Sequence, residues 1–122
     1  MTSDLDPATL ASQRCVAVDA STPALDADDV SRLAAGLDDG WSVEDDRLVR
    51  TLRFPTFGAA YAGATRVALL AETQGHHPTL EVAWGRLTIA WTTDAIDGLT
   101  GNDFIMAAKV DRLLAKGLGP TG

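Results

Sequence analysis

The sequence predicts a single α+β domain: a four-stranded antiparallel sheet with helices packed on one face. Helical and strand-like apolar patterns follow one another in the order helix-strand-strand-helix-strand-strand-helix. The helices are therefore separated by hairpins rather than by single strands, which favours an antiparallel sheet over a parallel one. A length of 122 residues suits one modest core, and no internal repeat is present.

The first predicted helix spans residues 26–37. Asp26 can accept a hydrogen bond from a free N–H group at the helix start, and the acidic residues after it suit the positive end of the helix dipole. Two strands are predicted next, over residues 41–43 and 48–54, with a polar turn between them and Pro55 after the second. The predicted helix at residues 26–37 shows one apolar stripe at positions i, i+3, i+4 and i+7, formed by Val30, Leu33, Ala34 and Leu37.

The second predicted helix runs from Phe57 to about Thr73, with Thr56 as its N-cap and Gly75 as its stop. Gly58 and Gly63 lower its helix propensity, so we expect packing, or a close contact at a missing side chain, to hold it.

Alternating apolar residues predict two further strands, over residues 80–84 and 87–91, joined by a tight turn at residues 85–86. Trp84 and Trp91 fall on these strands and are expected to be packing residues. Thr100 can cap a last helix from Gly101 to about Lys116. The predicted domain covers residues 25–118, after a partly ordered leader at 1–24 and before a tail at 119–122.

Composition excludes several classes of function. The net charge is −7 and the ten Lys and Arg residues are scattered, which argues against nucleic acid as a partner. No apolar run approaches the length of about 18 to 20 residues that spans a bilayer, and no secretory signal is recognisable. Cys15 is the only cysteine, so no intrachain disulfide can form. We therefore expect a cytoplasmic protein that binds neither nucleic acid nor membrane.

The residues with the clearest chemical potential lie where the second helix ends. Glu72, His76 and His77 gather there, and these are the only two histidines in the chain. Glu72 and His76 are four residues apart and would share a face if the helix continued. Imidazole has an ordinary pKa near neutrality, which suits proton transfer. From spacing alone, a solvated histidine pair in a turn is an equally good interpretation.

The sequence resembles the pterin-4a-carbinolamine dehydratases from about residue 25 to residue 115. The motif of an acidic or polar residue, three spacers and His-His-Pro is present as residues 72–78, and the Gly-Leu-Thr motif with its downstream aspartate is present as residues 98–103. Trp41 follows a glycine, as the family's pterin-contacting tryptophan does. The family's third histidine, which follows a threonine, is replaced here by Asp94.

The resemblance implies the removal of water from a 4a-hydroxytetrahydropterin, with no metal and no cofactor other than the pterin substrate. His77 would be the general base, His76 would hold or protonate the leaving hydroxyl, and Glu72 would orient a histidine or the pterin. Trp41 would pack on the ring. An ionised Asp94 accepts hydrogen bonds only, so reduced or altered activity is expected, although its charge could raise the pKa of a nearby imidazole.

Asp103 has two interpretations. It could bind substrate, or it could close a capping box with Thr100 at the start of the last helix, and we favour the second.

Two alternative functions remain open. Some members of this family resemble the chain and act as non-catalytic Rubisco assembly factors in plastids and carboxysome-bearing bacteria, which would imply Rubisco large subunit as partner and carboxysome association. A metal site of His76, His77 and Asp94 is a weaker alternative. Family members form homo-oligomers, so a dimer or tetramer is expected.

Overall fold

The computed structural model describes residues 5–115 of the chain. The first four residues of the predicted leader and the predicted tail at 119–122 lie outside the described residues. The predicted order of helices and strands is confirmed, with two short 3₁₀ helices added. In chain order the elements are η2 (Pro7–Ser12), α1 (Ala27–Ala34), β1 (Ser42–Glu44), β2 (Arg47–Arg53), α2 (Phe57–Gln74), β3 (Thr79–Ala83), β4 (Arg86–Trp91), η3 (Asp94–Ile96) and α3 (Gly101–Ala115).

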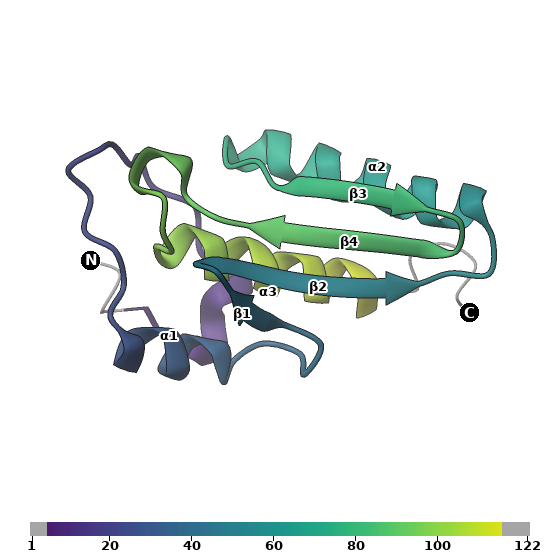
Figure 1. Cartoon of the computed structure of the whole chain (residues 1–122). Coiled ribbons are helices and arrows are strands. Elements are labelled where there is room, and N and C mark those ends of the chain that lie inside the picture. The colour runs from purple at the N-terminus through teal and green to yellow at the C-terminus, as the bar shows by residue number, and fades with distance from the viewer. Residues whose placement is uncertain (1–4, 116–122) are drawn as a thin grey trace.

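The four strands form one sheet in the order β1-β2-β4-β3, and every neighbouring pair is antiparallel (Figure 1). In the register, Leu48 lies opposite Trp91 and Leu80 lies opposite Ile89. These side chains belong to the face that α2 and α3 cover, since both helices lie behind the sheet in Figure 1. The predicted antiparallel sheet with helices on one face is confirmed.

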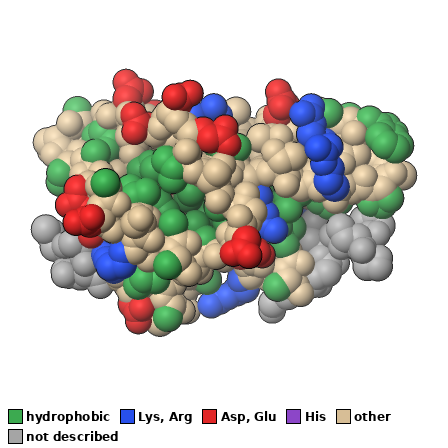
Figure 2. Space-filling view, turned by 60° about the horizontal axis from the view of Figure 1, so that its bottom comes forward, with side chains coloured by type: hydrophobic (Ala, Val, Ile, Leu, Met, Phe, Trp, Pro, Cys, Tyr) green, Lys and Arg blue, Asp and Glu red, His purple; other side chains and the backbone are tan. Residues whose placement is uncertain are grey.

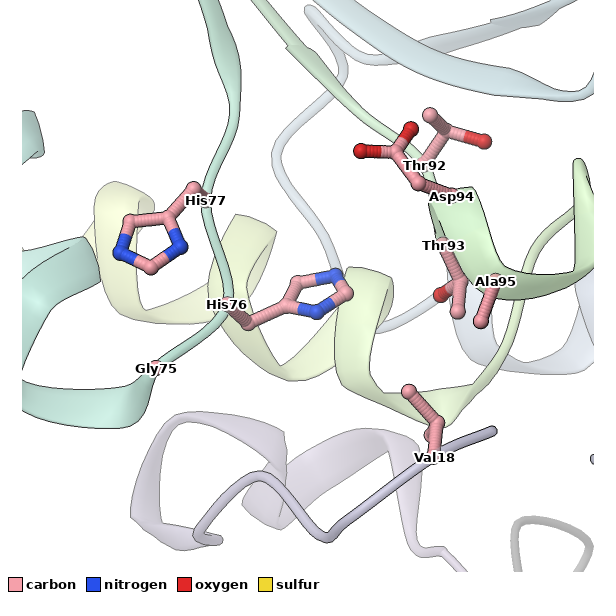
Figure 3. A pocket seen from close by; sticks show the side chains of 8 residues that line it. All are labelled: Val18, Gly75, His76, His77, Thr92, Thr93, Asp94 and Ala95. Carbon is pink, nitrogen blue, oxygen red and sulfur yellow. The ribbon is translucent and has the colours of Figure 1, made fainter. Parts of the chain in front are cut away.

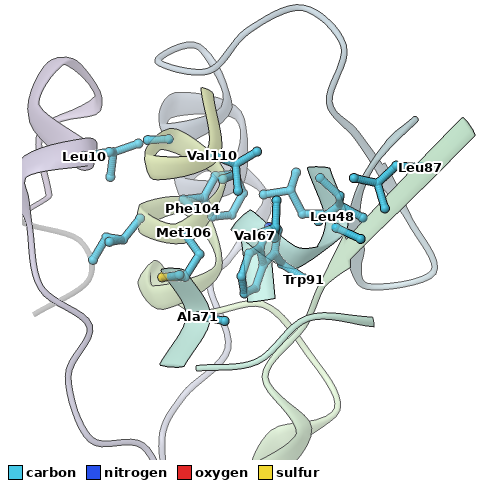
Figure 4. Close-up of a cluster of buried hydrophobic side chains, with 14 of the residues drawn as sticks. Leu10, Leu48, Val67, Ala71, Leu87, Trp91, Phe104, Met106 and Val110 are labelled. Carbon is cyan, nitrogen blue, oxygen red and sulfur yellow. The ribbon is translucent and has the colours of Figure 1, made fainter. Parts of the chain in front are cut away.

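The core lies between that face and the two long helices (Figure 4). Trp91 and Phe104 are its largest members, and both are fully buried. The leader contributes as well, because Leu10 of η2 is only 1% exposed. The largest fully buried apolar side chains are Leu10, Leu33, Leu48, Val67, Leu87, Ile89, Trp91, Phe104, Met106 and Val110.

Two local features differ from the prediction. Helix α1 ends at Ala34, earlier than the predicted Leu37, because the chain tightens into turns in which the amide of Gly36 bonds to the carbonyl of Leu33. The expectation that Trp84 is a packing residue is wrong, since its side chain is 74% exposed. Strand β3 ends at Ala83, so Trp84 falls in the turn rather than on the strand. Trp91, in contrast, is buried as predicted.

Helix α2 tolerates Gly63 for a reason that the sequence only partly indicates. A Cβ atom at this position would lie 2.9 Å from Cζ of the buried Phe54 ring. The missing side chain therefore lets the helix approach the end of β2 closely, as one of the two predicted explanations requires.

Candidate active site

Gly75 determines where the two histidines lie. It ends α2 in the left-handed conformation, with φ of 65°, and its amide bonds to the carbonyl of Ala71. Only glycine adopts this conformation without strain. His76 and His77 consequently lie in the link to β3, and their side chains point in different directions (Figure 3).

His76 is the buried histidine of the pair. Its Nε2 lies 2.7 Å from Oδ1 of Asp103, and its ring stacks on Trp91 with centroids 6.0 Å apart and planes 11° apart. Because a carboxylate oxygen only accepts, Nε2 carries the proton and Nδ1 bears the free lone pair of the neutral ring. The stack on Trp91 and the hydrogen bond to Asp103 therefore constrain the orientation and the tautomer of the His76 ring.

Asp103 is fully buried, and hydrogen bonds hold both of its oxygens. Oδ2 accepts from the hydroxyl of Thr93 at 2.8 Å and from the amide of Thr100 at 3.0 Å. The two threonine hydroxyls are also 2.8 Å apart. The contact with the Thr100 amide is one half of the predicted capping box, but the Thr100 hydroxyl pairs with Thr93 instead. Asp103 thus caps α3 and holds His76 at the same time.

His77 has its own carboxylate partner at the surface. Its Nε2 lies 2.7 Å from Oε2 of Glu72, and the side chains are 59% and 71% exposed. Glu72 would share a helical face with His76 only if α2 continued, but the turn at Gly75 ends the helix and brings His77 to Glu72 instead. The expectation that Glu72 orients a histidine therefore has a geometric basis, with His77 as that histidine.

The two histidines open on one pocket of about 200 Å³ (Figure 3). Asp94, the first residue of η3, lies on the opposite wall and is exposed. Three of the predicted site residues thus meet here from two separate segments of the chain. The complete lining is Val18, Gly75, His76, His77, Thr92, Thr93, Asp94 and Ala95.

Trp41 and Asp103 are not part of this lining. The Trp41 indole donates to Oδ1 of Asp111 at 2.8 Å, and Arg50 reaches the same oxygen at 2.6 Å. Asp103 acts on the pocket only through His76 and Thr93. Contact of either residue with a pterin stays a prediction.

Sequence reasoning missed Thr93 and Val18. The Thr92-Thr93 pair marked only the position of the missing histidine, and its proximity to Asp103 depends on the packing of β4 against α3. Val18 gives no local signal, because only the path of the leader brings it to the pocket.

Neither a metal cluster nor a membrane-spanning segment is found between residues 5 and 115. No three His, Cys, Asp or Glu side chains in that part of the chain gather closely enough to hold a metal ion, so His76, His77 and Asp94 do not form such a group. No helix there is long and apolar enough to cross a bilayer. On the face shown in Figure 2, acidic side chains are spread among apolar ones, and the Lys and Arg side chains stand apart from one another.

Comparison with known proteins decides the family. Residues 23–113 match the family model described as pterin 4 alpha carbinolamine dehydratase. The chain belongs to this family. Two relatives that carry the family's name come from Chlorobium limicola and Rubrobacter xylanophilus, each 46% identical. The alignments cover 81% of this chain and 90% of the Chlorobium protein, and 85% of this chain and 97% of the Rubrobacter protein.

The fold of this dehydratase-family chain is also found in a solved structure. A transcriptional coactivator/pterin dehydratase from Brucella melitensis superposes with a TM-score of 0.68 at 28% identity, over 75% of this chain and 98% of that one. The pocket described above lies at the His-His-Pro segment, and the catalytic roles of its residues stay predictions.

Proposed function

We propose that this protein is a pterin-4a-carbinolamine dehydratase, which removes water from a 4a-hydroxytetrahydropterin and gives the quinonoid dihydropterin. The observation that supports it best is the arrangement of His76 and His77, each paired with a different carboxylate and both lining one pocket. Membership of the family supplies the substrate class.

The elimination needs one group to take a proton from a ring nitrogen and another to give a proton to the departing hydroxyl. Glu72 accepts from Nε2 of His77, which leaves Nδ1 with the lone pair that a general base requires. Exposure of His77 also lets the acquired proton pass to water. His77 is therefore the base in this mechanism, and Glu72 fixes its tautomer.

His76 holds the leaving hydroxyl. Asp103 accepts from Nε2, so a proton taken up at Nδ1 would give an imidazolium whose charge the adjacent carboxylate stabilises. That imidazolium can donate to the hydroxyl as the bond from C4a to oxygen breaks. The stack on Trp91 keeps the ring in one orientation throughout. No metal or further cofactor is required for either proton transfer.

Asp94 changes the third position of the site. An ionised carboxylate there cannot protonate the hydroxyl, but it can accept a hydrogen bond from the amino group of a pterin. We therefore assign it to substrate binding and expect slower turnover than three imidazoles would give.

The test is a dehydration assay with freshly generated 4a-hydroxytetrahydropterin. Wild-type protein should accelerate water loss above the spontaneous rate, and His77→Ala should abolish the acceleration. Thr51→Ala is a suitable control because Thr51 lies on the opposite, uncovered side of the sheet and is exposed. A correctly folded wild-type protein without any acceleration would contradict the proposal.

A non-catalytic Rubisco assembly factor is the second candidate, and Asp94 is the observation that favours it. In this alternative the altered pocket no longer turns over, and an exposed apolar surface binds the Rubisco large subunit. Phe57 and Tyr61 of α2 stack on each other while remaining 48% and 59% exposed, and Leu69 is 63% exposed. Absence of turnover together with co-purification of Rubisco, or location in carboxysomes, would decide for this role over a cytoplasmic enzyme.

A homo-oligomer is compatible with both candidate functions. Strands β1 and β3 are the two edges of the sheet, and an exposed edge offers unpaired backbone groups to another chain. A homo-oligomer, dimer or tetramer, would cover such an edge and the apolar side chains of α2. Light scattering after size-exclusion chromatography measures the mass directly, and a monomer at micromolar concentration would contradict this part of the proposal.

A further inference from the structure

We propose that residues 13–18, here called the strap, form a wall of the pocket, with Val18 in contact with bound pterin and Asn102 and Gln74 as positioning residues. This inference rests on the proposed pterin-binding function. The match to the family model begins at residue 23, so the strap lies before the matched region.

Asn102 holds the strap through both polar groups of its amide. Its Oδ1 accepts from the Val16 amide at 2.9 Å, and its Nδ2 donates to the Val16 carbonyl at 2.8 Å. Asn102 is only 3% exposed, so in the folded chain Val16 rather than water satisfies these two groups. A buried amide whose donor and acceptor both serve one backbone residue holds that residue in a single position.

Gln74 provides a second attachment. Its Oε1 accepts from the Cys15 amide at 2.9 Å. Gln74 is the last residue of α2 and stands two positions before His76, while Asn102 directly precedes Asp103. The strap therefore docks on the same two segments that place the buried imidazole.

The start of the strap is held as well. Leu10, a few residues earlier, is buried in the core, and Lys109 of α3 donates to the Ala11 carbonyl at 3.0 Å. Anchors on α3 thus lie on either side of Gln13 and fix the direction in which the chain runs toward Val18.

Val18 gives the pocket an apolar side. Val18 and Ala95 lie on the side of His76 away from His77 (Figure 3). A pterin ring is flat, and an apolar surface can pack against one of its faces or substituents. Its polar edge can then contact the imidazoles. Removing two methyl groups from such a wall weakens binding without touching the groups that move protons.

Cys15 reports whether the strap is docked. It is the only cysteine in the chain, and burial raises the pKa of its thiol from 9.0 to about 11. Asp103 acts in the same direction and Lys109 opposes it. The thiolate is the species that reacts, so a docked strap labels slowly at pH 8, and release of the strap restores the ordinary reactivity of the thiol.

The experiment follows the labelling of Cys15 by an aromatic disulfide reagent at pH 8 in the full-length protein, with and without 7,8-dihydrobiopterin. The Kd of this pterin is measured by calorimetry on the same samples. The variants are Val18→Ala, which shortens the wall but keeps the docking contacts, and Asn102→Ala, which removes the main contact. Ser21→Ala is the control, since Ser21 lies in the leader, is exposed, and has its amide and hydroxyl bonded to the exposed Asp19.

We expect pterin to slow the labelling of wild-type Cys15, because a ligand stabilises the state that it binds. Asn102→Ala should label about tenfold faster or more. Val18→Ala should label like wild type without ligand but bind pterin about fivefold more weakly. If turnover is measured, Val18→Ala should raise KM and leave kcat nearly unchanged. Ser21→Ala should match wild type throughout.

Distinct results separate the failure of this inference from that of the proposed function. Wild-type protein that binds no pterin would overturn both. Pterin binding with equal Kd in Val18→Ala, and no effect of pterin on labelling, would overturn the inference alone. If Asn102→Ala does not fold, Gln74→Ala replaces it, since Gln74 is only half-buried, and unchanged labelling in that variant would overturn the docking role.

Discussion

Nε2 of His76 and Oδ1 of Asp103 lie 2.7 Å apart, with the Asp103 side chain fully buried and the His76 side chain 9% exposed. This pair connects the start of α3 with the link between α2 and β3. Any change at Asp103 therefore affects both the start of α3 and the proposed catalytic imidazole of His76. A milder variant is needed to separate the effect on stability from the effect on catalysis.

Asp103→Ala should lower the free energy of unfolding by about 3 to 5 kcal/mol, because three buried donors lose their acceptor. Thr93→Val removes only one hydroxyl and should cost about 1 to 2 kcal/mol. Urea denaturation of both variants measures this. A loss below about 1 kcal/mol in Asp103→Ala would show that the network is not a stabilising unit.

Glu72→Gln, in contrast to Asp103→Ala, should keep the stability of the protein and lower its turnover. The pair with His77 is largely exposed, so stability should stay within about 0.5 kcal/mol of wild type. Turnover should fall about tenfold, because a neutral amide no longer favours the tautomer with Nδ1 as base. The comparison of kcat with the urea midpoint makes the distinction. A large loss of stability with unchanged kcat would contradict the assigned role of Glu72.

The fold was predictable because its signals are local. Helical and alternating apolar patterns identified all four strands and the three α-helices, and the N-caps at Asp26 and Thr56 are present as expected. Trp84 was misassigned because periodicity does not show at which residue a hairpin turns. A shift of one position there separates a packed side chain from an exposed one.

The site was predictable only in part. His76, His77 and Asp94 meet at one pocket, as the family motifs suggested. The sequence does not reveal which carboxylate pairs with which histidine, because this pairing depends on the turn at Gly75 and on the packing of α3. The docking of Val16 by Asn102 spans 86 positions of sequence and has no motif.

Two glycines of α2 give opposite expectations for the same substitution. Gly63→Ala should destabilise the protein by about 1 kcal/mol or more, because its Cβ would press on the buried Phe54 ring. Gly58→Ala meets nothing closer than 4.0 Å, so better helix propensity should stabilise by about 0.5 to 1 kcal/mol. Thermal unfolding of the two variants shows whether each is less or more stable than wild type. Stabilisation by Gly63→Ala would show that Phe54 can move aside.

Alkaline pH should weaken the fold through Cys15. Its folded pKa of about 11 lies above the ordinary 9.0, so the unfolded chain loses this proton first and stability falls as pH rises from 9 to 11. Burial lowers the pKa of Lys109, which gives a contribution of the opposite sign. To isolate the effect of Cys15, urea midpoints of wild type and Cys15→Ser are measured from pH 9 to pH 11. The difference between the two proteins in how their midpoints change with pH gives the contribution of Cys15. Parallel curves for the two proteins would contradict the prediction.

Asp94→His tests whether the third position limits turnover. An imidazole there can donate a proton to the leaving hydroxyl, which the carboxylate cannot do, so kcat should rise about tenfold or more. Asp94→Asn removes the charge without supplying an acid and should not reproduce the gain. Because Asp94 is exposed, neither variant should unfold the protein. Equal kcat in Asp94→His and wild type would mean that His76 and His77 suffice for both proton transfers. Zero turnover in both, with intact pterin binding, would favour the assembly-factor role instead.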